Sequence, residues 1–399
     1  MQPSTAQFRF ASISVQDESI DNILAAVSGQ MLDRLGEHVD LALVFPSSYF
    51  LKHAAGLGAN LRRAIGARVM IGCCAEGVIG PEHEIENEPA LAVVAAQLPG
   101  VGIHPFHISG RDAMELASAP ARLPEHFRAA KDTRGIVMIA DPFSTPMERV
   151  LDTFNTSCAG VPIIGGLASA ARQPGENRLF MNDTVMKDGL VGVGLSGAVQ
   201  LDVIVSQGCR PIGPVFEVTG ASTNIIESLG GAPPMERIGA VLEALDESDR
   251  ELLSNGLFIG RAIDSTRETL GRGDFLIRGV LGADSRTGAI AIGDEIKIGE
   301  RVQFHLRDAR TAREDLEMML TPHALFGAPS GAFLFSCNGR GTNLYDEPDG
   351  DISAINSFFR GIDLAGFFCA GEIGPIGGKN FLHGHTASLA LIRPSGRAL

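Results

Sequence analysis

The feature that most constrains the fold is a unit that recurs three times along the chain. In each copy an apolar strand ends in a small or polar loop, a helix follows, a second apolar strand runs into a glycine-rich turn, and a third strand returns. Short apolar strands that alternate with amphipathic helices are typical of sheets covered by helices. The sequence therefore predicts an α/β protein of repeated strand–helix–strand–strand units, which form helix-covered mixed sheets in two domains. The predicted strands are 41–48, 68–77 and 90–97 in the first copy, 135–142, 161–169 and 190–195 in the second, and 332–341, 364–373 and 386–392 in the third.

The strongest interruption in the middle of the chain is the glycine- and proline-rich cluster at 230–234. A helical pattern restarts after it, and a hairpin-rich stretch follows from 275 to 306. A chain of 399 residues favours two domains, because single cores usually stop growing well below that size. We therefore expect one domain over 30–230 and a second over 231–393.

The helix of the second copy has a start signal of its own. Thr145-Pro-Met-Glu148 has the spacing of a capping box, with proline at the first helical position. Apolar residues at 147, 150, 151 and 154 then form one face. This pattern predicts a helix docked on a sheet, with the Thr145 side chain as its N-cap.

Composition excludes several classes of partner. The formal net charge is −14, which repels nucleic-acid phosphates and anionic lipid, so neither nucleic acid nor a membrane surface is expected as a partner. No signal peptide is visible, and no apolar run reaches the roughly 18–20 residues that span a bilayer. The six cysteines are spread along the chain, apart from one adjacent pair, as is typical of reduced thiols. We expect a cytoplasmic protein.

One glycine string has the spelling of a dinucleotide-binding motif. It is Gly-Val-Gly-Leu-Ser-Gly at 192–197. The apolar sequence that follows continues as a strand, whereas the motif requires a helix whose N-terminus faces the pyrophosphate. The string is therefore interpreted as strand, and no cofactor is expected.

The loop that follows the strand at 332–337 is the most informative string. Asn338, Gly339 and Gly341 leave backbone amides free at the end of a strand, where α/β folds commonly place ligands. Arg340 in the same loop could bind a ligand carboxylate with two parallel donors. The alternative is a sharp turn with a surface arginine.

A second informative string begins at Gly371 and runs to Thr386. Glu372 leaves an apolar strand at a glycine, so if it is buried it needs a cationic partner. A ligand ammonium would serve, and so would Arg340. Cys337 with His383 or His385 is an alternative nucleophile–base pair, although buried cysteine is commoner than catalytic cysteine. The same residues with Cys369 would be a zinc set, but no Cys-x-x-Cys spacing is present, so no metal is expected.

At these strings the chain resembles the FIST family, a module of two parts, FIST N and FIST C. The similar strings follow the family order over nearly the whole chain. They are Ile-Gly-Cys-Cys-Ala-Glu at 71–76, Val-Pro-Ile-Ile-Gly-Gly at 161–166, Val-Thr-Gly-Ala-Ser-Thr-Asn-Ile-Ile-Glu at 218–227, Phe-Ser-Cys-Asn-Gly-Arg-Gly at 335–341, Gly-Phe-Phe-Cys-Ala-Gly-Glu-Ile-Gly-Pro at 366–375, and His-Gly-His-Thr at 383–386.

The resemblance implies an intracellular sensory protein of bacterial signalling that binds a small polar metabolite, with amino acids as the ligand class usually suggested. No kinase, methyl-acceptor or cyclase segment is fused here, so signalling would run through a separate protein. Two alternatives stay open, a cysteine-dependent hydrolase and a recruitment scaffold, and the oligomeric state is undetermined. We expect strand-end loops from both domains to meet in one interdomain cleft. The expected ligand-binding residues are Arg340, Glu372, Asn338, Gly339, Gly341, Ser47, Cys73, Glu76, Gly165, Gly166 and His385.

Overall fold

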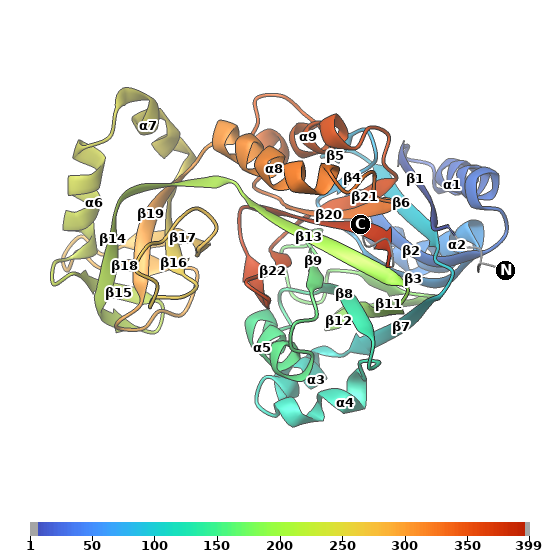
Figure 1. Ribbon diagram of the computed structural model, residues 1–399, viewed down its shortest axis with the longest axis horizontal. Coiled ribbons are helices and arrows are strands. Elements are labelled where there is room, and N and C mark those ends of the chain that lie inside the picture. Colours follow the sequence, from blue (N-terminus) through green and yellow to red (C-terminus); the bar gives the residue numbers. More distant parts are fainter. Residues whose placement is uncertain (1–6, 396–399) are drawn as a thin grey trace. The chain divides into compact units, whose positions relative to one another are not determined.

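The computed structural model describes residues 7–395, which form two compact units (Figure 1). Unit 1 contains the chain up to residue 205, residues 316–382 and the chain from residue 386 on. Unit 2 contains residues 206–315 and 383–385. The domain boundary predicted at residue 230 stays a prediction, because the division into compact units follows the contacts of the folded chain and does not require each domain to be one continuous segment.

Unit 1 contains three sheets of six strands, and the strand order follows one rule in all three. The first sheet has the order β1 (Arg9–Gln16), β6 (Ala90–Gln97), β2 (Val39–Pro46), β3 (Ala67–Cys73), β10 (Leu179–Met181) and β11 (Thr184–Met186). The second has the order β7 (Val101–Ile108), β12 (Leu190–Gly197), β8 (Thr133–Ala140), β9 (Ile163–Leu167), β22 (Glu372–Ile376) and β23 (Lys379–His383). The third has the order β13 (Val199–Gln207), β24 (Thr386–Pro394), β20 (Gly331–Cys337), β21 (Leu364–Cys369), β4 (Gly77–Ile79) and β5 (Glu84–Glu86).

Each sheet therefore repeats the predicted unit. The first and second strands of a copy, β2 and β3, β8 and β9, or β20 and β21, pair in parallel. The returning strand, β6, β12 or β24, pairs antiparallel with the first. This arrangement confirms the α/β class and the threefold repeat of mixed sheets.

The last two strands of every sheet come from another copy. The hairpin β10–β11 of the second copy extends the first sheet, β22–β23 of the third copy extends the second sheet, and β4–β5 of the first copy extends the third sheet. The exchange is cyclic, so no copy completes its own sheet. The sequence did not predict these hairpins or the leading strands β1 and β7, whereas the strand expected after the glycine string at 192–197 is β13.

Three glycines fix which residues of the copies are equivalent. Gly72, Gly165 and Gly366 occupy the second strand of each parallel pair. An added Cβ would lie 1.9, 1.7 and 1.6 Å, respectively, from the carbonyl oxygen of the register partner in the first strand. No side chain fits at such a distance, so each copy needs glycine at this place, and the copies can be aligned on it.

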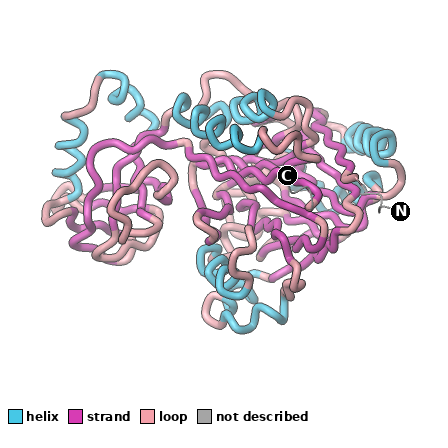
Figure 2. Tube along the Cα trace, viewed as in Figure 1, coloured by secondary structure: helices cyan, strands magenta, loops and turns pink. Residues whose placement is uncertain are grey.

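Helices cover one face of each sheet, and the opposite faces share one core (Figure 1, Figure 2). The first sheet packs on α1 (Ile20–Leu35) and α2 (Ala54–Ile65), and the second on α3 (Gly110–Leu116), α4 (Leu123–His126) and α5 (Met147–Ser157). The third sheet packs on α9 (Gly350–Phe358) and the C-terminal part of α8 (Ala309–Ala324). The shared core joins residues of all three sheets; Phe45, for example, contacts Phe335 and Phe367.

The helix of the second copy forms as predicted, but its N-cap differs. Val150, Leu151 and Phe154 are buried on one face of α5. The predicted capping box is wrong, because Thr145 Oγ1 donates to the carbonyl oxygen of Gly189 at 3.0 Å, and the N-cap position is taken by Pro146. The threonine hydroxyl is used by the loop before the returning strand.

Unit 2 contains a closed β-barrel, two α-helices and the first residues of α8. Its strands run in the order β14 (Cys209–Ser222), β15 (Ile225–Leu229), β18 (Ile290–Ile292), β17 (Phe275–Ala283), β16 (Leu257–Ala262) and β19 (Arg301–Arg307). The hairpin-rich stretch predicted at 275–306 supplies three of these strands. The helices are α6 (Pro234–Glu243) and α7 (Glu247–Leu252).

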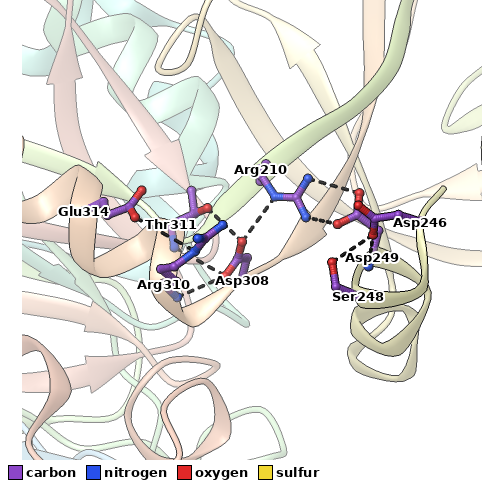
Figure 3. Close-up of polar contacts among 8 residues, drawn as sticks. All are labelled: Arg210, Asp246, Ser248, Asp249, Asp308, Arg310, Thr311 and Glu314. Atoms are coloured by element: carbon purple, nitrogen blue, oxygen red, sulfur yellow. Dashed lines mark hydrogen bonds and ion pairs between the residues drawn. The ribbon is translucent and has the colours of Figure 1, made fainter.

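Arg210 connects the start of the barrel to both neighbouring helix N-termini (Figure 3). Its Nε lies 3.2 Å from Asp308 Oδ2, and its two terminal nitrogens contact the Asp249 carboxylate of α7. Asp308 also accepts the backbone N–H of Arg310 at 3.0 Å and the hydroxyl of Thr311 at 2.8 Å, so it caps the first turn of α8. One guanidinium thus fixes α7 and the start of α8 to β14.

Candidate functional site

Strand ends of the first and third copies surround a small polar pocket in unit 1. Its volume is about 30 Å³. Glu76 and Asn338, both predicted as ligand-binding residues, contribute to its wall. The full lining is Glu76, Gly77, Glu86, Asn87, Asn338, Asn343 and Phe368.

The pocket wall is connected by hydrogen bonds that reach all three copies. Asn338 Nδ2 donates to Glu76 Oε2 at 3.1 Å, and Asn343 Nδ2 donates to the carbonyl oxygen of Asn338 at 2.9 Å. The second copy supplies Ser169, whose Oγ accepts the backbone N–H of Glu76 at 2.9 Å and donates to the carbonyl oxygen of Phe368. The three strand ends therefore meet around this pocket.

The loop after β20 is pressed against the hairpin of the first copy. Glu86 accepts from the backbone N–H of Thr342 at 2.8 Å and from its hydroxyl at 3.1 Å. Gly341 has φ +54°, and an added Cβ would lie 2.4 Å from Glu86 Oε1. Gly339 donates its N–H to Cys337 Sγ at 3.4 Å. The backbone therefore approaches the Glu86 carboxylate at Gly341 and the Cys337 thiol at Gly339.

Arg340 is completely buried, so the interpretation as a surface arginine is wrong. Its Nε lies 2.8 Å from Asp351 Oδ2 and its Nη2 lies 2.6 Å from Asp351 Oδ1. Nη2 also contacts the Tyr345 hydroxyl at 2.8 Å, and Ser336 donates to Asp351 at 2.7 Å. The bidentate fork expected for a ligand carboxylate is engaged by a carboxylate of the protein. Nη1 has no hydrogen-bond partner among the described residues.

Glu84 of the exchanged hairpin caps helix α9. Its Oε1 accepts the backbone N–H groups of Asp351 and Ile352, both at 2.9 Å. Asp349 accepts the N–H of Glu84 at 2.6 Å and lies 3.0 Å from His83 Nδ1. Burial, with the Asp351 charge as a second cause, raises the pKa of Glu84 to about 8.

Glu372 is also completely buried, and its partner is Thr386. Its Oε2 accepts the N–H of Thr386 at 3.0 Å and its hydroxyl at 2.8 Å. Burial raises the pKa of Glu372 to about 8, against the opposing influence of Thr386, Cys337 and Arg340. The carboxyl group is therefore mostly protonated at neutral pH, which removes the need for the cationic partner expected from the sequence.

The cysteines of the site are buried free thiols. Cys337 ends β20, Cys369 ends β21, and the two are register partners. Cys73 ends β3. Burial raises the pKa of the Cys73 and Cys369 thiols well above the ordinary value.

The candidate bases belong to a different compact unit from the candidate nucleophile. Cys337 lies in unit 1, whereas His383 and His385 lie in unit 2. His385 has φ +61°, and its ring centroid lies 4.4 Å from that of Phe258. Over residues 7–395 no three His, Cys, Asp or Glu side chains are grouped so that they could hold a metal ion.

The remaining predicted residues have structural contacts. Ser47 is buried, and its Oγ accepts the N–H of Ala90 at 3.1 Å. An added Cβ at Gly166 would lie 2.3 Å from Cys369 Sγ, and one at Gly165 would lie 1.7 Å from the carbonyl oxygen of Met138. Ser47, Gly165 and Arg340 all belong to unit 1, so the strand-end loops gather within one compact unit.

The sequence did not identify Glu84, Glu86, Asn87, Ser169 or Asn343 as site residues. The available signal was the short acidic run between the second strand and the returning strand of the first copy. That segment has no extended apolar pattern, because its strands β4 and β5 are three residues long; β4 pairs with the third copy, and β5 pairs with β4. Asn87 at its end has φ +59°, a conformation that asparagine tolerates better than most residues.

No helix in the described part of the chain is long and apolar enough to span a bilayer.

Comparison with known proteins supplies the family. Residues 40–232 match the FIST N domain and residues 238–375 match the FIST C domain. An uncharacterized protein of Mycobacterium tuberculosis is 42% identical over 354 residues, which cover 88% of this chain and 90% of the relative. An uncharacterized protein of Mycobacterium bovis is 40% identical over 368 residues, which cover 91% of this chain and 93% of the relative.

Among solved structures, a cyanuric acid hydrolase is similar with a TM-score of 0.30 and 10% identity, covering 98% of this chain and 100% of that one. A second, from A. caulinodans, has a TM-score of 0.27 with the same identity and coverage. FIST domains are described as sensory domains that bind small ligands in signal transduction. The two domain matches and the curated relatives show that this chain belongs to the FIST family.

Proposed function

We propose that this protein is a sensory protein that binds a small polar metabolite through an ammonium group, with Glu76 and Asn338 as the contacts, and that it acts through a separate signalling protein. The observation that supports this proposal is the chemistry of the pocket. Its wall carries two carboxylates and three carboxamides, and none of its lining residues is cationic. Carboxylate and amide oxygens accept hydrogen bonds from an ammonium group, and the carboxylates add charge attraction.

The size of the pocket limits what enters it. Pockets that enclose a whole ligand measure roughly 300–1,000 Å³. A volume of about 30 Å³ admits one head group, and the rest of the ligand must lie at the rim. Arg172 lies beside the lining residue Glu76, with Nη2 3.9 Å from Glu76 Oε1 and a side chain that is 93% exposed. An amino acid would place its ammonium group against Glu76 and Asn338 and its carboxylate near Arg172.

Arg340 and Glu372 take supporting positions in this proposal. Arg340 fixes the loop that carries Asn338 by binding Asp351 and Tyr345. Glu372 is neutral near pH 7 and bonded to Thr386. The cation receptor and the anion receptor of the zwitterion are therefore Glu76 and Arg172, in place of the pair expected from the sequence.

Calorimetric titration with amino acids, primary amines and matched carboxylic acids tests the proposal. Glu76→Gln keeps the shape of the side chain and removes its charge, so it should weaken binding of an amine-bearing ligand by about tenfold or more. Glu88→Gln makes the same charge change at an exposed position of the same segment and should leave affinity unchanged. Equal binding of acids that lack an amine, or unchanged affinity in both Glu76→Gln and Asn338→Ala, would contradict the proposal.

A further inference from the structure

The threefold repeat shows which polar residues the fold does not need. Cys337 and Cys369 are register partners, and Cys369 lies three residues after the aligned Gly366. The position three residues after the aligned glycine has a partner at or directly after the end of the first strand of every copy. In the first copy a parallel β-bridge joins Ser47 and Ala75. In the second copy the N–H of Ala168 donates to the carbonyl oxygen of Ala140, the residue before Asp141. The equivalent pairs are therefore Ser47–Ala75 and Asp141–Ala168. Only the third copy has two thiols at this position.

The same comparison singles out Glu372. One residue after each aligned glycine, the second strand pairs with the exchanged hairpin. The hairpin residue at this position is Leu179 in the first sheet, Val78 in the third, and Glu372 in the second. In the other two sheets an aliphatic residue occupies the place at which the second sheet buries Glu372, so the repeat does not require a carboxyl group there. Glu372 lies beside both Cys337 and Cys369.

The backbone places the two thiol residues within reach of each other. Register partners in neighbouring strands lie about 4.8 Å apart, which falls in the range of roughly 4.4–6.8 Å between the Cα atoms of a disulfide. Both residues are the last of their strands, and the N–H of Asn338 donates to the carbonyl oxygen of Cys369 at 2.9 Å, which holds the two strand ends together. The strands they end are β20 and β21, which the structure pairs in parallel.

Cys337 is the thiol that a small reagent can reach. Residue Cys337 is 6% exposed, whereas Cys369 is completely buried. The residues that follow Cys337 and precede Cys369, Asn338 and Phe368, both line the pocket. A volume of about 30 Å³ admits a molecule the size of hydrogen peroxide. The N–H of Gly339 donates to Cys337 Sγ at 3.4 Å.

We propose that Cys337 and Cys369 form a dithiol that hydrogen peroxide oxidises to a disulfide. Cys337 sulfur attacks one peroxide oxygen, the O–O bond breaks, and a sulfenic acid forms with release of one water. Cys369 sulfur then attacks Cys337 sulfur, the S–O bond breaks, and the sulfenic oxygen leaves as a second water with the Cys369 proton. Two thiols lose two electrons and two protons, and one peroxide becomes two waters.

This reaction goes beyond the proposed ligand binding and is independent of it. The disulfide would tie the end of β20 to the end of β21, next to Asn338 and Phe368. The walls of the pocket would thereby be cross-linked, so the oxidised protein would differ from the reduced one at the place where we propose that the metabolite binds.

The test uses the full chain, reduced, freed of reductant and exposed to stoichiometric peroxide. Remaining thiols are then blocked by alkylation, and peptides are separated without reduction. Cleavage after Arg313, Arg340, Arg360 and Lys379 places Cys337 in peptide 314–340 and Cys369 in peptide 361–379, so their disulfide appears as one linked species. We expect that species as the main product, reversed by dithiothreitol.

Variants separate the two steps. Cys369→Ser should stop at the sulfenic acid, trapped by dimedone on Cys337, and Cys337→Ser should leave Cys369 unmodified. Cys158→Ser, another buried thiol, should form the linked species as the native chain does. Alkylation of both Cys337 and Cys369 in the native chain after peroxide treatment, or a linkage of Cys337 to another cysteine, would overturn the proposal. The native-chain experiment decides the matter even if a variant fails to fold.

Discussion

Arg340 and Asp351 form a completely buried bidentate ion pair, with the guanidinium Nε and Nη2 lying 2.8 and 2.6 Å from the two carboxylate oxygens. Arg340 belongs to the loop after β20 and Asp351 to the first turn of α9. Glu84, from the first copy, bonds to the backbone of that same turn. The pocket loop, the helix and the exchanged hairpin are therefore fixed at one point.

Removing one partner of this pair should destabilise the ligand-free protein strongly. Arg340→Met leaves the Asp351 carboxylate buried without its cation, which should lower the free energy of unfolding by about 3–5 kcal/mol in urea titrations. Arg286→Met is the control, because Arg286 lies 3.9 Å from Asp284 with an 85% exposed side chain, and it should change little. Wild-type stability in Arg340→Met would show that the arginine is instead available to a ligand.

Stability should fall as the pH rises from about 6 to above 8. Glu84 and Glu372 have pKa values of about 8 in the folded protein, against an ordinary value of 4.5. Folding therefore binds protons between these values, so the stability that the two groups contribute is complete below pH 4.5 and is lost as the pH passes through 8. Melting curves should show a loss on the order of 1–2 kcal/mol for each group between pH 6.5 and 8.

The glutamine variants identify the groups responsible. Glu84→Gln and Glu372→Gln cannot ionise, so each should flatten the pH profile and raise the melting temperature at pH 8.5 relative to the native chain. Glu88→Gln, at an exposed position, should reproduce the native profile. A native profile that rises from pH 6.5 to 8.5 would contradict the assignment.

The aligned glycines should tolerate no side chain. Gly165→Ala would place Cβ 1.7 Å from the carbonyl oxygen of Met138, so strands β8 and β9 would have to separate. We expect loss of soluble folded protein or a decrease in unfolding free energy greater than about 3 kcal/mol. Gly29→Ala, in α1 with no atom within 4 Å of the added Cβ, should instead stabilise by up to about 1 kcal/mol. Circular dichroism during thermal unfolding measures both.

In unit 2, Arg210→Met should loosen α7 more than the barrel. Arg210 is the side chain that contacts both Asp249 and Asp308, and these groups are partly buried (Figure 3). Hydrogen exchange should accelerate in α7 and in the first turn of α8, with an overall loss of about 1–2 kcal/mol. Unchanged exchange in α7, as expected for the exposed control Arg310→Met, would show that Asp249 and Asp308 do not depend on the arginine.

The sequence by itself determined the repeated unit. The nine strands predicted in the three copies correspond to strands of the structure, because long apolar runs bounded by glycine-rich turns depend on local pattern and burial. The sequence also pointed to Glu76 and Asn338, since polar residues after buried strands collect at one sheet edge.

Only the tertiary structure decided how the copies combine. The exchanged hairpins have strands as short as three residues, and their partners lie in another copy, so no local pattern reports the pairing. The sequence also did not predict the hydrogen-bond partners of the buried polar groups. Arg340 binds Asp351 and Glu372 binds Thr386, because each group, once removed from water, must use whichever partner the completed fold places within bonding distance.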